Sequence, residues 1–342
     1  MRTPRACGAS GNASWIIALA LGLAGCGGGG GDPVTARIAT LEIFAGTWGP
    51  AASVDGTGSQ ANFFSIADMA FDGEGNLLVV DSAIRKVTPA AVVSTLASPP
   101  RIFRVIAVDR SGQAFVGEWQ FGVCRLGTCS FGGSIHRMDS TGATTMLTGV
   151  HSVGGLVATN GDLYWTDFQM HAIRRLSAAG DLTTVAGIEG SRGSEDGPGQ
   201  TARFNFPEGL AMDRAGNLYV ADSLNHTIRK IAPDGAVTTI AGSPGAIGSN
   251  DGAGSAARLN LPAGLAVDDT GNLYVADAGN CTVRKVSPAG IVTTVAGSAG
   301  ACGVFIGGAL PGALHAPRHV ALKGNDLYIG MRHGIAVVRP RP

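Results

Sequence analysis

A small group of ionisable residues in this chain has side chains suited to recognising a ligand. Arg104 and Arg318 could each bind a carboxylate or another oxyanion through two parallel hydrogen bonds. Glu208 and Asp68 could contribute carboxylates, and His319 could contribute an imidazole. These residues lie far apart in the sequence. Only a fold that brings distant segments to one opening could unite them.

Metal binding and nucleophilic catalysis have weaker support. Only His151 and His319 are expected beside the same opening, and two histidines make an incomplete zinc site, so we expect neither metal nor cofactor. No Gly-x-Ser-x-Gly motif supplies a catalytic serine. An Asp-Gly-x-Gly motif recurs, but no Walker-type lysine follows it and it offers too few oxygens for calcium, so it predicts turns.

Four cysteines after residue 26 are candidates for disulfides, which form in exported proteins. Cys281 and Cys302 lie in two loops that should share one face of the fold. Cys124 and Cys129 lie close together in a single insertion. Each pair could therefore form a bridge.

The N-terminal 25 residues have the order of basic, apolar and small residues that is typical of a secretory signal. The apolar run is about half of the roughly 20 residues that a transmembrane helix needs. The residues before Cys26 resemble the lipobox of bacterial lipoproteins, which implies cleavage there and lipidation of Cys26. Residues 26–36 would then form a glycine-rich tether. Gly27, in place of an acidic residue, implies an outer-membrane lipoprotein that faces the periplasm or the exterior.

The charge balance argues against one class of partner. Removing residues 1–25 leaves 23 basic and 25 acidic residues, a formal charge of −2. Nucleic-acid binding requires a basic surface that contacts phosphates, so we do not expect a nucleic-acid partner.

The sequence repeats with a period of 55 residues. Residues 207–242 and 262–297 match at most positions, and each copy contains four short segments separated by Gly, Asn, Asp and Pro. The second segment, NLYVAD at 217–222, recurs with variations to give six units, which predicts an all-β, six-bladed β-propeller. The last unit lacks a fourth strand, and residues 40–46 copy that strand. The propeller domain is therefore expected over residues 37–340, closed by its N-terminal strand.

The segments NLYVADSLNHTIRKI and NLYVADAGNCTVRKV resemble NHL repeats. The connections SEDGPGQTARFNFP and SNDGAGSAARLNLP are similar to those of a bacterial NHL subgroup. The resemblance implies a six-bladed propeller that usually binds proteins or other ligands. A minority of similar propellers are lyases or lactonases.

Residues that recur from blade to blade are interpreted as scaffold. His171 and His226 occupy the position of the family's own histidine. The four tyrosines share one repeat position and are expected to pack between sheets. One set of aspartates ends the second strand and is expected to accept backbone hydrogen bonds: Asp81, Asp167, Asp222 and Asp277.

The position just before the first strand varies instead. We call the face that carries the blade-to-blade linkers and the loops between second and third strands the upper face. At its mouth we expect Arg104, Glu208 and Arg318 on alternate blades, with Asp68, His319 and His151 nearby. Two interpretations remain open: these charges pair with one another or face solvent, or they bind an acidic or polar ligand.

The leading functional prediction is a noncatalytic binding module, monomeric and anchored to the membrane through lipid alone. Its partner at the upper face would be a protein, a glycan or a small polar ligand. The alternative is a propeller enzyme, a lyase or a lactonase-type hydrolase, with a metal-assisted site on the same face.

Overall fold

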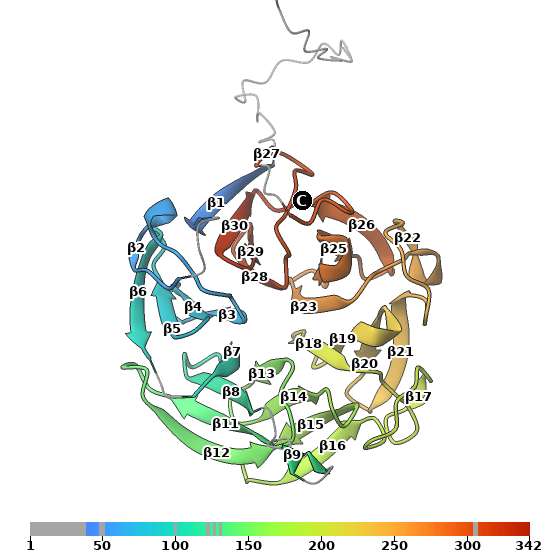
Figure 1. The fold of residues 1–342 in the computed structure, drawn as a ribbon. Coiled ribbons are helices and arrows are strands. Elements are labelled where there is room, and N and C mark those ends of the chain that lie inside the picture. The colour runs from blue at the N-terminus through green and yellow to red at the C-terminus, as the bar shows by residue number, and fades with distance from the viewer. Residues whose placement is uncertain are drawn as a thin grey trace, which may run out of the picture. The chain divides into compact units, whose positions relative to one another are not determined.

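The computed structural model describes residues 39–47, 52–98, 101–120, 124–125, 128–129, 132–303 and 307–342. Within them, six antiparallel sheets follow one another around a ring, each with its first strand innermost (Figure 1). The prediction of an all-β, six-bladed propeller is confirmed. None of the described helices is long and apolar enough to cross a bilayer. Cys26 and the expected signal and tether lie outside the described residues.

Each blade has four main strands, named here from the channel outward. Blade 1 contains β3 Asp68–Phe71, β4 Leu77–Val80, β5 Ile84–Val87 and β6 Val92–Ala97. Blade 2 contains β7 Phe103–Val108, β8 Ala114–Gln120, β11 Gly132–Met138 and β12 Thr144–Val150. Blade 3 contains β13 Leu156–Ala158, β14 Leu163–Asp167, β15 Ala172–Leu176 and β16 Leu182–Ala186.

The remaining blades follow the same plan. Blade 4 contains β18 Pro207–Met212, β19 Leu218–Asp222, β20 Thr227–Ile231 and β21 Ala236–Gly242. Blade 5 contains β23 Pro262–Val267, β24 Leu273–Asp277, β25 Thr282–Val286 and β26 Ile291–Ala296. Blade 6 contains β28 His319–Lys323, β29 Asp326–Gly330, β30 Gly334–Arg339 and β1 Thr40–Gly46. Two-residue strands of the linkers add a fifth, outermost strand to four blades: β2 Gly56–Thr57, β17 Gly197–Pro198, β22 Gly252–Ala253 and β27 Gly308–Ala309.

Aspartate-led turns join the first two strands of a blade. In blade 4, Asp213 Oδ1 accepts hydrogen bonds of 2.9 Å from the backbone N–H groups of Ala215 and Asn217. Gly216 has a φ of +84°, a left-handed conformation that favours glycine. The same turn is made in blades 1, 2 and 5 by Asp72, Asp109 and Asp268.

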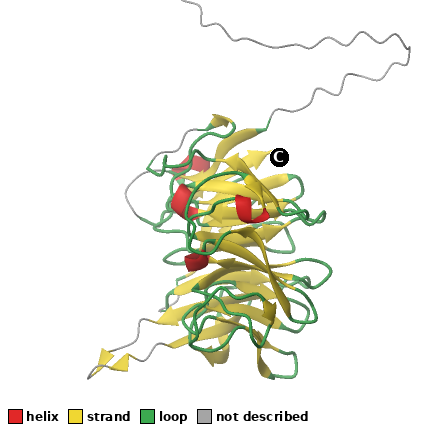
Figure 2. Ribbon diagram, turned by 90° about the vertical axis from the view of Figure 1, so that its right-hand side faces the viewer, coloured by secondary structure: helices red, strands yellow, loops and turns green. Residues whose placement is uncertain are grey.

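The ring is closed by the N-terminal strand, as predicted. β1 pairs with β30 from Thr40 opposite Arg339 to Gly46 opposite Gly334. Figure 2 shows the ring edge-on, with loops on both faces of the strands. Closure gives the blade-6 sheet its fourth strand and covers an edge that would otherwise be open to pairing with another chain.

Apolar side chains fill the spaces between neighbouring blades. Tyr219 of blade 4, for example, packs in one buried cluster with Leu265 and Val275 of blade 5. Tyr274 packs in the next cluster with Ile329 of blade 6. The tyrosines are therefore packing residues between sheets, as their shared repeat position predicted.

A fully buried arginine fastens the incoming linker to its blade. In blade 4, Arg229 Nη1 lies 2.7 Å from Asp222 Oδ2 at the end of β19, and Nη2 lies 2.7 Å from Asp196 Oδ1 in the linker. The guanidinium also donates to two backbone carbonyl oxygens of the linker. Asp196 accepts hydrogen bonds from the backbone and hydroxyl of Thr239 in β21. Arg229 and Asp196 together thus join three strands to the linker.

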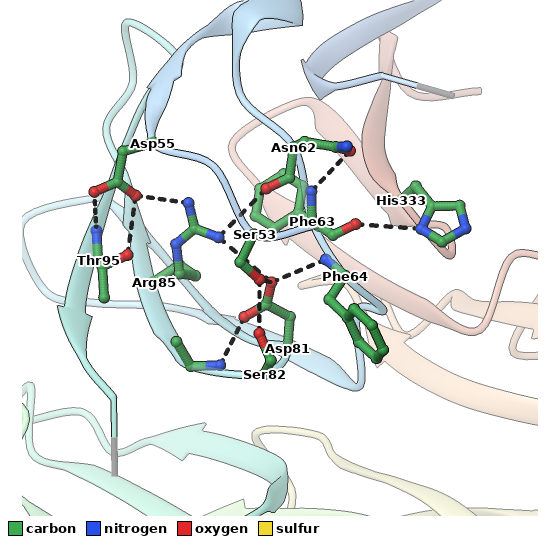
Figure 3. Close-up of polar contacts among 11 residues, drawn as sticks. Ser53, Asp55, Asn62, Phe63, Phe64, Asp81, Ser82, Arg85, Thr95 and His333 are labelled. Carbon is green, nitrogen blue, oxygen red and sulfur yellow. Dashed lines mark hydrogen bonds and ion pairs between the residues drawn. The ribbon is translucent and has the colours of Figure 1, made fainter. Parts of the chain in front are cut away.

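Figure 3 shows the equivalent cluster in blade 1. Arg85 Nη2 lies 2.6 Å from Asp55 Oδ1, and its Nη1 lies 3.4 Å from Asp81 Oδ2. In blade 5 the same roles are taken by Arg284, Asp251 and Asp277. The strand-ending aspartates belong to the scaffold, as predicted, but the arginine that they hold was not predicted from the sequence.

Two blades replace this cluster. In blade 2, Glu118 and His136 occupy the places of the aspartate and arginine, and the linker supplies a cation, with Arg101 Nη1 2.8 Å from Glu118 Oε1. Blade 6 carries two buried apolar residues at those places, Met331 and Ala336. In blade 6 the acid and the base are thus both replaced by apolar residues.

One predicted disulfide is present. Cys281 and Cys302 are bonded, with a Cα–Cα distance of 5.1 Å, and join the β24–β25 loop to the linker toward blade 6. Backbone pairing sets Cys124 opposite Cys129 in the short strands β9 Cys124–Arg125 and β10 Thr128–Cys129. The side chains of Cys124 and Cys129 lie outside the described residues, so the second disulfide stays a prediction.

We expect Arg229→Met to destabilise the domain by about 3–5 kcal/mol, because it leaves the buried Asp222 carboxylate without its cation. Burial raises the pKa of Asp222 to about 6, against the opposing effect of its hydrogen bonds and of Arg229. Arg214→Met is the control, because Arg214 and its partner Asp269 are both 75% exposed, and should cost about 1 kcal/mol or less. Urea denaturation measures the free energy of unfolding of both variants. An equal decrease in the two would contradict the assigned role of Arg229.

Candidate functional site

The six first strands enclose a cavity of about 870 Å³ on the axis of the ring. All six contribute to its lining. Every first strand begins at the upper face, so the first residues of these strands surround the upper mouth and later residues line the deeper part. The volume falls in the range of sites for small molecules and cofactors.

Glycines let neighbouring first strands approach closely at this mouth. A Cβ atom at Gly155 would lie 2.6 Å from the backbone nitrogen of Leu210, and one at Gly264 would lie 2.6 Å from the carbonyl oxygen of Arg318. A Cβ atom at Gly209 would likewise clash with the carbonyl oxygen of Ala263. No side chain fits at these three positions, which belong to the same place in the repeat.

Blades 6 and 1 carry His319 and Asp68 at the place of those glycines. His319 Nδ1 lies 3.1 Å from Asp68 Oδ1, and the two side chains are 18% and 19% exposed. Asp68 Oδ2 also accepts a 3.0 Å hydrogen bond from the backbone N–H of Ile106 in β7. The pair therefore links blades 6, 1 and 2 at the mouth.

The three charged residues expected on alternate blades all line the cavity. Arg318 Nη2 lies 3.5 Å from Glu208 Oε2, with side chains 57% and 25% exposed, so these two form an ion pair past the intervening blade 5. Arg104 is the second residue of β7 and is exposed. The sequence left open whether these charges pair with one another or face solvent, or bind a ligand. In the structure, Arg318 pairs with Glu208, and Asp68 pairs with His319.

We call the five residues Asp68, Arg104, Glu208, Arg318 and His319 the rim. The cavity lining below the rim is apolar where the first strands continue, with Ala70, Val108, Ala158, Met212 and Val267. The rim therefore has two carboxylates, two guanidinium groups and an imidazole above an apolar channel.

The apolar side chains beside the rim were not predicted from the sequence. Phe64 and Ile102 line the mouth although 50% and 68% of their surfaces are exposed. Phe168 and Phe206 also line it, with ring centroids 4.7 Å apart. Their positions in the sequence could have indicated a place at the mouth. Within a few residues before a first strand lie Phe64, Ile102 and Phe206.

His151 does not join this group. Its Nδ1 lies 3.6 Å from Asp167 Oδ2, its side chain is 55% exposed, and it is absent from the cavity lining. Within the described residues, no three His, Cys, Asp or Glu side chains are grouped so that they could hold a metal ion.

The repeat is similar to sequences of known proteins. Residues 204–231 and 259–286 match the family model described as NHL repeat. The chain contains NHL repeats. The protein SUPPRESSOR OF QUENCHING 1, chloroplastic, of Arabidopsis thaliana is 32% identical over 181 residues. That alignment covers 49% of this chain and only 17% of the Arabidopsis protein, so this chain spans a small part of its relative.

Solved structures share the propeller. An auxiliary nutrient binding protein from Bacteroides thetaiotaomicron has a TM-score of 0.71 at 18% identity, covering 88% of this chain and 76% of that one. A gluconolactonase from Xanthomonas campestris has a TM-score of 0.58 at 16% identity. The alignment covers 92% of this chain and 94% of that one. At these identities the likeness shows the fold alone.

Two histidines that share one position of the internal repeat hold the linkers that shape the mouth. His171 Nδ1 accepts a 3.1 Å hydrogen bond from the backbone N–H of Phe206, and His226 Nδ1 accepts one of 3.2 Å from Leu261. Cys281 has the same repeat position and the same φ of +58° as His226, and it forms the disulfide to the next linker instead. These contacts support the interpretation of His171 and His226 as scaffold.

Acid should weaken the hydrogen bond that His226 accepts. Burial lowers the pKa of His226, so the folded state favours the neutral ring that can accept at Nδ1. Its contribution to stability is therefore complete above about pH 6.5, the ordinary imidazole value, and is lost as the pH falls from there toward the lowered pKa. We expect the stability difference between the wild type and His226→Ala to be largest above pH 7 and to shrink below pH 6, measured by urea denaturation. A difference that grows in acid would contradict this assignment.

Proposed function

We propose that this NHL propeller is a noncatalytic binding module that takes a small ligand into its central cavity through the upper mouth. The observation that carries the proposal is the central cavity of about 870 Å³, with ionisable groups gathered at its mouth and apolar walls below. Ligand sites are usually apolar cavities with a small number of polar groups directed into them. The auxiliary nutrient binding protein that shares the fold is consistent with this role.

The place of action that we propose is the bacterial envelope. Residues 1–25 have the pattern of a secretory signal, and Cys26 follows a lipobox-like sequence. Acyl chains on Cys26, inserted in an outer membrane, would hold the propeller in the periplasm or at the exterior, where it would meet solutes before they reach the cytoplasm.

The test measures which small molecules the purified protein retains from an envelope extract, identified by mass spectrometry after denaturation. The wild type should retain a ligand that Arg104→Ala/Arg318→Ala loses, because both guanidinium groups lie on the rim. Each exposed arginine should change stability by only about 0.5 kcal/mol. Arg110→Ala/Arg214→Ala, in turns at the opposite ends of first strands, is the matched control. No retained molecule, or equal retention by both double variants, would contradict the proposal.

A second candidate is a hydrolase or lyase, favoured by the contact between His319 and Asp68 inside the cavity. A carboxylate on Nδ1 holds the proton there and leaves Nε2 able to act as a general base. We would measure hydrolysis of glucono-1,5-lactone, with and without added zinc or calcium. If this candidate holds, turnover above background should be lost in His319→Gln. No turnover under any of these conditions would refute lactonase activity.

A further inference from the structure

The charges of the rim are balanced, and this balance restricts the ligand. Two carboxylates, Asp68 and Glu208, face two guanidinium groups, Arg104 and Arg318, with His319 against Asp68. The other ionisable residue of the lining, Asp81, has a fully buried side chain held by Arg85 and contributes no accessible charge. The four carboxylate and guanidinium side chains of the rim therefore sum to a formal charge of zero, with His319 not counted.

The ion pair between Arg318 and Glu208 is open to exchange. Its Nη2–Oε2 distance of 3.5 Å is longer than a direct hydrogen bond between such groups, and the Arg318 side chain is 57% exposed. Both backbones are fixed, since the carbonyl oxygen of Arg318 accepts a 2.8 Å hydrogen bond from Gly264 and that of Glu208 accepts one from Thr166. The side chains can therefore separate around a ligand without moving the strands.

A ligand with one charge could satisfy only one member of this pair. An anion on Arg318 would leave Glu208 facing the ligand's negative charge, and a cation on Glu208 would leave Arg318 beside a positive one. A zwitterion replaces both partners at once, with its ammonium group on Glu208 and its carboxylate on Arg318. The apolar channel below then accepts an apolar body.

Resting on the function proposed above, we propose that the cavity binds a ligand with an α-amino-acid head and an apolar body, inserted body first. Glu208 binds the ammonium group, Arg318 binds the carboxylate, and the channel below the rim encloses the apolar part. L-Phenylalanine is the minimal probe of this chemistry, because it combines the head with a compact apolar ring.

The experiment compares four probes by calorimetry with the full chain: L-phenylalanine, its N-acetyl derivative, its amide, and glycine. The first three share one ring but carry a zwitterion, a single negative charge and a single positive charge. Glycine keeps the zwitterion without the ring. We expect L-phenylalanine to bind at least about tenfold more tightly than each of the others.

Two variants locate the effect. Glu208→Gln should remove the preference for L-phenylalanine over the N-acetyl derivative, and Arg318→Gln should remove the preference over the amide. Arg214→Gln, which breaks an exposed ion pair with Asp269 at the opposite ends of the first strands, should leave both preferences unchanged. Loss of either preference in this control would contradict the placement of the head on the rim.

Failure of this inference and failure of the proposed function give different results. Comparable binding of the N-acetyl derivative or the amide would overturn the zwitterionic head but leave the cavity as a ligand site. Comparable binding of glycine would overturn the apolar body. No binding of any probe up to about 10 mM would overturn the amino-acid head, while a ligand retained from envelope extract would still support the binding module.

Discussion

The blades depend on one interaction, a buried guanidinium that lies between two carboxylates. In blade 4, Asp222 binds Arg229 within the blade, and Asp196 of the incoming linker binds the same guanidinium. Removing one partner from such a group is costly, whereas replacing the acid and the base together by apolar residues can be tolerated. Blade 6, with Met331 and Ala336, is an instance of that replacement within the same molecule.

That constraint also explains the position of the candidate site. A linker fastened over the outer strands must then cross to the channel, where it starts the next first strand. His226 holds the arriving segment at Leu261, and glycines such as Gly264 set how closely the strands meet. The mouth is thus built by contacts that repeat, and the residues that differ there, Arg318 and His319 among them, are those to which our proposals assign a role.

Internal repetition made much of this predictable from the sequence. The six blades, the closing strand at 40–46 and the scaffold roles of the tyrosines follow from comparing copies within one chain. The pairing partners did not follow, because a repeat position defines where a backbone lies and not which way a long side chain turns. Arg318 could face any neighbour, and its contact with Glu208 depends on the exact spacing of the strands around blade 5. The burial of Arg229 was missed because a charged residue in a strand is more commonly exposed.

The pairing of β1 with β30 has a consequence for how the protein is made. Thr40 lies opposite Arg339, so the first strand of the propeller needs its last one as a neighbour. No partially synthesised chain can complete the ring, and β1 must wait unpaired until the entire propeller sequence has emerged. Such long-range contacts are slow to form, so ring closure is a late step in biogenesis. Until then the unpaired edges of β1 and β30 are open to pairing with other chains.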